Sequence, residues 1–176
     1  MKDILRAKCL ISAEIESLIN QQIRKEAQSS STYLGMASWC DRNGFDNSAT
    51  YFYKQAEEER HHQLKFFKYI LDMGGTSISP DITGVKNDYN TFREVFEDAL
   101  EQEISVTQSI KNIAARCHKE QDYVTLEFLN WFLKEQREEE YKARRAIELF
   151  EIIGEQGTGH WEIDKHVGQI KYDSEA

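Results

Sequence analysis

Hydrophobic side chains recur at helical spacing along four long stretches of this chain, and no sustained run alternates as a β-strand does. The periodicity predicts helices over residues 12–39, 46–73, 91–118 and 123–153, with a short fifth helix over residues 160–170. Thr91 and Glu94 have the spacing of a capping box, and the single proline, Pro80, lies between predicted helices. The predicted fold class is therefore all-α.

The connection between the second and third predicted helices, residues 76–90, is long for a compact domain. Such a connection can run the length of a bundle and start the next helix at the opposite end. We therefore expect a four-helix bundle with a long crossover between helices 2 and 3 and a short fifth C-terminal helix. This domain should span residues 12–170, between an N-terminal extension (1–11) and a polar C-terminal tail (171–176).

Each long helix also carries polar residues on its apolar face, namely Glu26, Glu59, His62, Glu103, Gln136 and Glu139. A single glutamate in such a place more often lies at a bundle edge, with its charged end in water. An ionised carboxylate left unpaired in the interior would cost several kcal/mol. Inward carboxylates must therefore be paired, protonated or bound to a metal.

A shift of 77 residues (103 − 26, 136 − 59 and 139 − 62) places Glu26 on Glu103, Glu59 on Gln136 and His62 on Glu139. The same shift places Lys65 on Lys142, although overall identity is low and any two amphipathic helix pairs agree in part. Helix pairs related by a pseudo-two-fold axis would bring these polar groups together at mid-bundle. Their four carboxylates would neutralise two divalent cations, and oxygen-rich ligation with one imidazole favours iron or manganese over structural zinc.

Composition narrows the function classes further. The 176 residues carry a formal net charge of −9, which argues against a nucleic-acid partner. The three cysteines, Cys9, Cys40 and Cys117, favour a reducing compartment over a disulfide framework. With neither a signal-peptide pattern nor a membrane-spanning run, a cytoplasmic protein without a membrane partner is expected.

Over residues 12–170 the chain resembles the ferritin family, specifically the haem-free bacterial-type ferritins. The matching positions are Glu26 with Tyr33, Glu59-x-x-His62, Glu103 and Gln136-x-x-Glu139, together with Ser38-Trp39-Cys40 and Trp131. The resemblance implies a homo-oligomeric shell of 24 subunits. It also implies a ferroxidase, which oxidises Fe(II) with O2 or H2O2 and stores ferric mineral inside the shell.

The resemblance implies two iron ions per subunit. Glu26, Glu59 and His62 would hold one, and Glu59, Glu103 and Glu139 the other. Gln136 would orient the oxidant or a ligand, and Tyr33 would be a hydrogen-bonding and electron-donating neighbour. A third iron position would use Glu58, Glu135 and Glu138, with Glu139 shared. These acidic runs fit solvated helix surface equally well.

The chain departs from related patterns in two places. Bacterioferritins have E-x-x-H in both halves, whereas the second half here has Gln136-x-x-Glu139, so a permanent di-iron cofactor site of that kind is not expected. No haem is expected either. The acidic pair that lines an iron channel in animal ferritins is replaced by Leu126 and Leu129, which leaves the route of iron open. His61 and His118 are expected to be exposed.

Two other functions fit parts of the pattern. One is a monomeric or dimeric di-iron oxidase or peroxidase of the rubrerythrin kind, although the chain has no cysteine-rich module. The other is a non-enzymatic, DNA-protecting cage, although the chain has no basic tail and a negative net charge.

Overall fold

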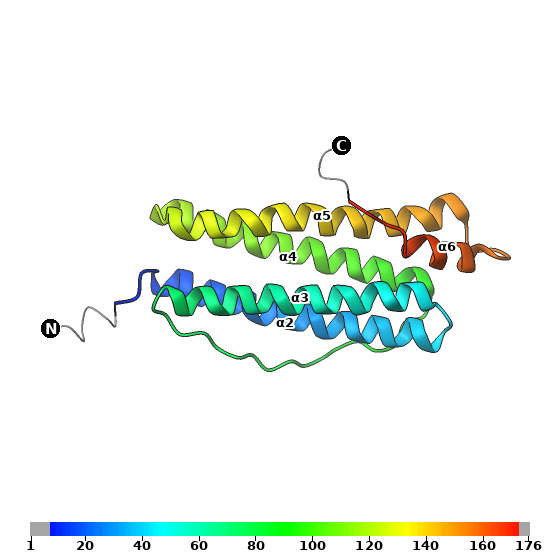
Figure 1. Ribbon diagram of the computed structural model, residues 1–176, viewed down its shortest axis with the longest axis horizontal. Coiled ribbons are helices and arrows are strands. Elements are labelled where there is room, and N and C mark those ends of the chain that lie inside the picture. The colour runs from blue at the N-terminus through cyan, green and yellow to red at the C-terminus, as the bar shows by residue number, and fades with distance from the viewer. Residues whose placement is uncertain (1–7, 173–176) are drawn as a thin grey trace.

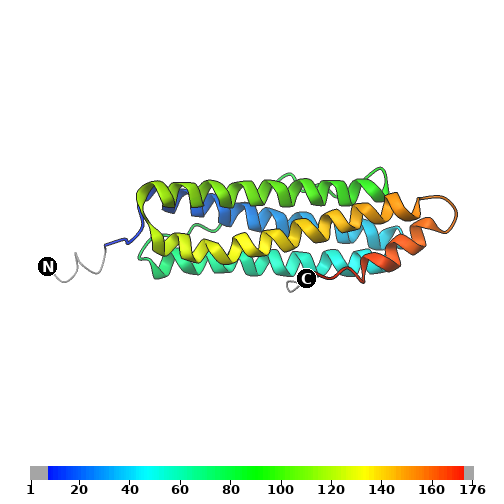
Figure 2. The same ribbon diagram turned by 90° about the horizontal axis from the view of Figure 1, so that it is seen from above.

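The computed structural model describes residues 8–172, and within this range it contains five helices and no strand. The helices are α2 (Ala13–Arg42), α3 (Asp46–Asp72), α4 (Phe92–Glu120), α5 (Tyr123–Ile153) and α6 (Gly159–Val167). Helices α2 to α5 run side by side along the molecule, and α6 folds back at one end (Figure 1, Figure 2). The predicted four-helix bundle with a short fifth helix is confirmed.

The helix ends lie within three residues of the predicted ones. Helix α2 continues past Trp39 because the turn begins only at Asn43, and Gly44 follows with a φ of 80°. At the start of α4 the Thr91 hydroxyl accepts the Glu94 N–H, as the capping-box spacing predicts. Helix α6 is shorter than predicted and ends at Val167.

The crossover between α3 and α4 runs along the outside of the bundle (Figure 1). It delivers α4 to the α2–α3 turn, where the rings of Phe45 and Phe92 stack with centroids 3.8 Å apart. A Cβ atom at Gly35 would lie 2.5 Å from the Lys86 carbonyl oxygen, so glycine lets the crossover lie directly on α2. The second helix pair therefore starts from the opposite end of the bundle to the first, as expected from the length of the crossover (Figure 1).

The apolar core is divided into two clusters along the bundle. One lies toward α6 and includes Tyr33, Phe52, Phe96, Phe150 and Ile163. The other lies toward the opposite end and includes Ile19, Ile23, Phe66, Ile110 and Phe132. The boundary between the clusters falls, on each long helix, at the inward polar positions that interrupt its apolar face.

Helix α6 is attached through a buried carboxylate. Asp164 accepts hydrogen bonds from the backbone N–H groups of Asn47 (3.2 Å) and Ser48 (2.8 Å) and from the Asn47 side-chain amide (2.8 Å). Phe45, at the N-cap of α3, has no side-chain oxygen to offer. Asp164 therefore supplies from α6 the cap that α3 lacks.

Asp164→Ala should lower the free energy of unfolding by about 1.5–3 kcal/mol, which is what a hydrogen bond to a charged group contributes to stability. The backbone N–H groups of Asn47 and Ser48 would lose their acceptor. Denaturant unfolding of the metal-free protein measures this change. Glu162→Ala, on the more exposed side of the same helix, is the control. Equal effects of the two substitutions would contradict the capping role.

Residues 8–12 are not helical, and the Leu10 N–H bonds to the Met73 carbonyl at 2.8 Å. Residues 1–7 and 173–176 lie outside the described residues. The proposed N-terminal extension (1–11) and polar tail (171–176) therefore stay predictions. No helix within residues 8–172 combines the length and apolar character that crossing a membrane requires.

Candidate metal centre

Polar side chains from all four long helices are buried at the boundary between the two apolar clusters. Each of the following is at most 4% exposed: Gln22, Glu26, Tyr33, Glu59, His62, Glu103, Gln136 and Glu139. Helical periodicity brings them there, because each shares a face with core residues one turn away. The structure thus places every predicted mid-bundle residue in the interior.

Glu26, Glu59 and His62 form a compact group, with one ligand atom from each within 4.8 Å of the others. Within residues 8–172 no other cluster of three or more His, Cys, Asp or Glu residues meets this criterion. His62 Nδ1 lies 3.4 Å from Glu59 Oε2, and Gln22 donates a 2.8 Å hydrogen bond to Glu26 Oε1. The other oxygen of Glu26 and Oε2 of Glu59 are buried without a hydrogen-bond partner. These oxygens fit a cation.

The electrostatics of the centre favour a bound cation. Burial, reinforced by the neighbouring Glu59, raises the pKa of Glu26 well above its usual value. Burial and Glu103 do the same for the pKa of Glu59, and burial raises the pKa of Glu103. Burial raises the pKa of Glu139 to about 8, even though Lys142 opposes the shift. Metal binding would therefore release protons from these carboxyl groups.

Glu103 belongs to a second set of contacts. The Tyr33 hydroxyl donates a hydrogen bond to Glu103 Oε1, and the Gln136 amide donates one of 3.0 Å to Glu103 Oε2. Burial and the nearby Glu103 raise the pKa of Tyr33 well above its usual value, so the phenol keeps its proton. Three helices thereby fix the Glu103 carboxylate beside the compact group. It does not form a three-residue ligand cluster with Glu59 and Glu139.

The residues predicted for a third metal position are arranged less compactly. Glu58 is exposed and accepts a 2.6 Å hydrogen bond from Gln55, whereas Glu138 and Glu139 both contact the Lys142 ammonium. Glu135 is partly buried. Among residues 8–172 these carboxylates do not gather into a compact three-ligand group. The third position stays a prediction.

Aromatic rings enclose the imidazole of His62. Its centroid lies 5.5 Å from that of Trp131 and 5.8 Å from that of Phe132, both edge-on. The Lys65 ammonium lies 3.3 Å from the centroid of the Trp131 ring. These rings keep water from one side of the group and fix the plane of the imidazole.

Sequence reasoning missed several polar residues. Gln22 lies one turn before Glu26 on the same apolar face, and that spacing could have revealed it. Lys142 appeared only as the match of Lys65 in the internal repeat, without a role. The contact of Asp164 with α3 bridges more than a hundred residues and leaves no local pattern.

Leu126 and Leu129, which stand where animal ferritins have an acidic pair, belong to or pack against one apolar cluster. Leu129 is fully buried in the core and Leu126, partly buried, packs against the same cluster, so neither side chain offers a carboxylate to iron and the route of iron stays open. Between them, Glu127 is exposed and accepts a 2.9 Å hydrogen bond from the exposed Asn130. His61 and His118 are exposed, as expected.

Known proteins resemble this chain over almost its whole length. Residues 16–153 match the ferritin-like domain family. A probable bacterial non-heme ferritin-like protein of Haemophilus influenzae is 32% identical over 161 residues, covering 92% of this chain and 98% of that protein. The bacterial non-heme ferritin of Staphylococcus aureus is 32% identical over 166 residues, covering 94% and 100%. An open-pore ferritin of the archaeon Archaeoglobus fulgidus has a TM-score of 0.88 and 29% sequence identity, and the match covers 93% of this chain and 100% of that one.

Proposed function

The chain belongs to the ferritin family of iron-storage proteins, and we propose that it oxidises Fe(II) at a di-iron centre inside each subunit and stores the ferric product within a 24-subunit shell. The observation that carries this proposal is the buried group of Glu26, Glu59 and His62. Two of its carboxylate oxygens have no hydrogen-bond partner. A divalent cation supplies the missing partner.

Each residue of this centre has a distinct proposed role. Glu26, Glu59 and His62 bind one Fe(II), and Glu59, Glu103 and Glu139 bind the second, so that Glu59 bridges the two. The four carboxylates together carry −4, which two Fe(II) ions neutralise. Tyr33 and Gln136 hold Glu103 in position through their hydrogen bonds.

The redox step balances with either oxidant. Two Fe(II) ions give up two electrons. With two protons, these reduce O2 to H2O2, or H2O2 to two molecules of water. The carboxyl groups with raised pKa release protons when the cations bind, which supplies protons beside the reacting ions. Burial between two apolar clusters limits access of water to the centre.

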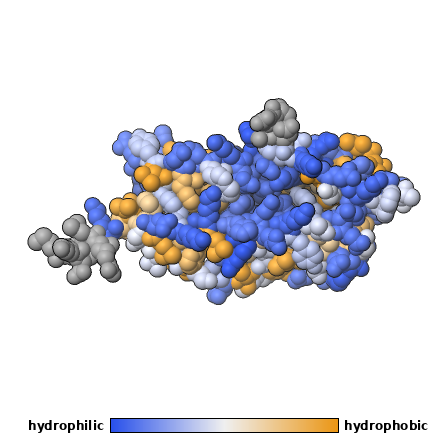
Figure 3. All heavy atoms as spheres, in the orientation of Figure 1, coloured by the Kyte–Doolittle hydropathy of each residue, from blue (hydrophilic) through white to orange (hydrophobic). Residues whose placement is uncertain are grey.

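Exposed apolar side chains on one helix pair support assembly. Leu34 on α2 is 48% exposed, and Tyr53, Leu64 and Leu71 on α3 are 37–53% exposed. The face of the subunit seen in Figure 3 is mostly hydrophilic, with apolar patches away from its centre. Leu34 and Tyr53 line one shared surface hollow, and a contiguous exposed apolar patch marks a surface that another subunit can cover.

Iron loading combined with size analysis tests the proposal. Apo-protein given Fe(II) without oxygen and then exposed to air should develop ferric absorbance. It should keep far more than two iron ions per subunit in solution. The iron should co-elute with particles the size of twenty-four copies of the 20.6 kDa chain. Rapid oxidation by a monomer or dimer that retains no mineral would instead indicate an oxidase of the rubrerythrin kind.

A further inference from the structure

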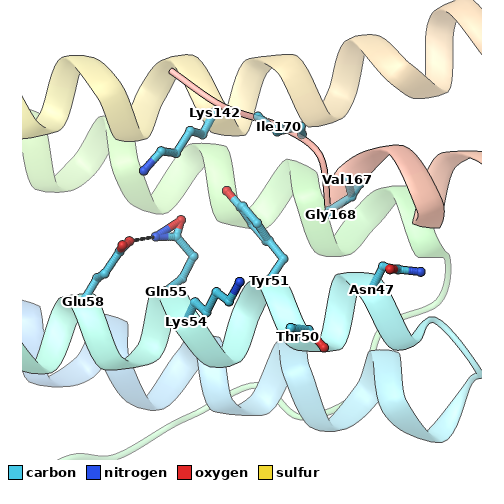
Figure 4. A pocket seen from close by; sticks show the side chains of 10 residues that line it. All are labelled: Asn47, Thr50, Tyr51, Lys54, Gln55, Glu58, Lys142, Val167, Gly168 and Ile170. Atoms are coloured by element: carbon cyan, nitrogen blue, oxygen red, sulfur yellow. Dashed lines mark hydrogen bonds between the residues drawn. The ribbon is translucent and has the colours of Figure 1, made fainter. Parts of the chain in front are cut away.

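A pocket of about 240 Å³ opens beside the metal centre, where α3 and α5 meet the segment that follows α6. Its walls include Tyr51, Gln55, Glu58 and Lys142, and Gly168 and Ile170 close one side (Figure 4). Glu58 is the residue before the central ligand Glu59. Lys142, another wall residue, lies 3.1 Å from an oxygen of the proposed ligand Glu139, so the pocket lies next to the metal centre.

Lys142 is a largely buried cation in the wall of this pocket. Its side chain is only 15% exposed, and its ammonium lies 2.7 Å from a Glu138 oxygen and 3.1 Å from a Glu139 oxygen. Glu138 and Glu139 precede Lys142 by one helical turn, the direction in which long helical side chains lean. Figure 4 shows the ammonium extending into the pocket toward Gln55 and Glu58. An ion pair this buried is screened far less than one at the surface.

The Lys142 ammonium contacts carboxylate oxygens that a third metal ion would need as ligands. Glu138 and Glu139 are two of the four carboxylates predicted for that position, and Glu58 faces the same pocket. A divalent cation could bind these oxygens only after displacing a tethered cation that is already bonded to two of them. Gln55 also holds Glu58, with a hydrogen bond of 2.6 Å.

We propose that Lys142 is a built-in counter-cation that occupies the third metal position and limits each subunit to the two ions of the mid-bundle centre. This inference rests on the proposed function, because it assumes that the neighbouring carboxylates bind metal. It makes Lys142 a residue that determines metal stoichiometry. Glu139 contacts Lys142 and also lies near Glu103. The lysine therefore also orients Glu139, a proposed ligand of the second ion.

Metal counting tests this role without measuring activity. Equilibrium dialysis against Co²⁺, followed by metal analysis, should give two bound ions per subunit for the wild type and for Lys142→Arg. Lys142→Met should bind three, because the unbranched apolar side chain frees both carboxylates. Adding Glu138→Gln to Lys142→Met should return the count to two. The visible spectrum of the bound Co²⁺ should show an additional site only in Lys142→Met.

Lys54→Met is the matched control, because Lys54 is an exposed lysine that lines the same pocket and carries the same charge. It should bind two ions. Three ions in the wild type, no gain in Lys142→Met, or an equal gain in Lys54→Met would overturn the role of Lys142. The proposed function fails separately, if Glu59→Ala with His62→Ala binds as many ions as the wild type. Whether or not the proposed function holds, the difference in bound Co²⁺ ions per subunit between Lys142→Met and the wild type decides the role of Lys142.

Discussion

The double variant Glu59→Ala with His62→Ala is expected to lose the rapid oxidation of Fe(II). Both side chains belong to the one compact ligand group within residues 8–172, and Glu59 is proposed to bridge the two ions. Removing a group that only orients a metal ligand costs about 10–100-fold in affinity or activity, so loss of two ligands should exceed this range. Stopped-flow absorbance after mixing Fe(II)-loaded protein with oxygen measures the rate.

The same helix provides a matched control. Glu57→Ala with His61→Ala removes the same two residue types, both exposed and turned away from the bundle interior. This variant should oxidise Fe(II) at the wild-type rate. Circular dichroism and gel filtration should show that both double variants keep the fold and the assembly. An unchanged rate in the Glu59 and His62 variant would show that oxidation takes place elsewhere.

The metal-free protein is expected to lose stability as pH rises from about 5 to about 9. Glu26, Glu59, Glu103 and Glu139 have pKa values in the folded protein above the unfolded value of roughly 4.3, and that of Glu139 is about 8. A group whose pKa is raised by folding contributes stability below its unfolded pKa. That contribution disappears as pH rises through the folded pKa. The loss should amount to a few kcal/mol, the cost of an uncompensated buried charge.

Chemical unfolding of chelator-treated protein across this pH range measures the loss. Glu59→Gln should reduce the pH dependence and stabilise the metal-free protein above pH 7, because the amide fills the same volume without a charge. Glu57→Gln should leave the pH dependence unchanged. Saturating Co²⁺ should restore the stability of the wild type, by about 4 kcal/mol at a thousandfold excess over the dissociation constant. A metal-free protein whose stability rises over this range would contradict the pKa shifts.

These two predictions have one physical origin. The centre places four carboxylates where the apolar core is interrupted, which destabilises the metal-free fold and prepares the oxygens for cations. Replacing such a ligand should therefore stabilise the empty subunit while removing its chemistry. Replacing a structural carboxylate would instead destabilise the fold. The sign of the stability change therefore distinguishes a metal-binding carboxylate from a structural one.

The sequence predicted the fold and the burial of the inward polar residues because both depend on local helical geometry. Glu26, Glu59 and His62 could be identified since each interrupts an apolar face whose period is fixed by the helix itself. The crossover followed from its length and from the glycines and Pro80 within or beside it. These features need no knowledge of how distant segments contact one another.

The remaining features depend on contacts between helices. The hydrogen bonds of Tyr33 and Gln136 to Glu103 join three helices, and the cap that Asp164 supplies to α3 joins residues more than a hundred positions apart. The position of Lys142 is a choice of rotamer, which spacing alone cannot select between solvent and the carboxylates.

Anomalous diffraction from crystals soaked in Fe(II) without oxygen tests the central claim most directly, because it locates the ions rather than their effects. We predict one iron peak bounded by Glu26, Glu59 and His62, and a second between Glu59 and Glu103, with neither peak in the Glu59→Ala variant. Iron found only on the subunit surface, or mid-bundle peaks that persist without Glu59, would contradict the proposed centre.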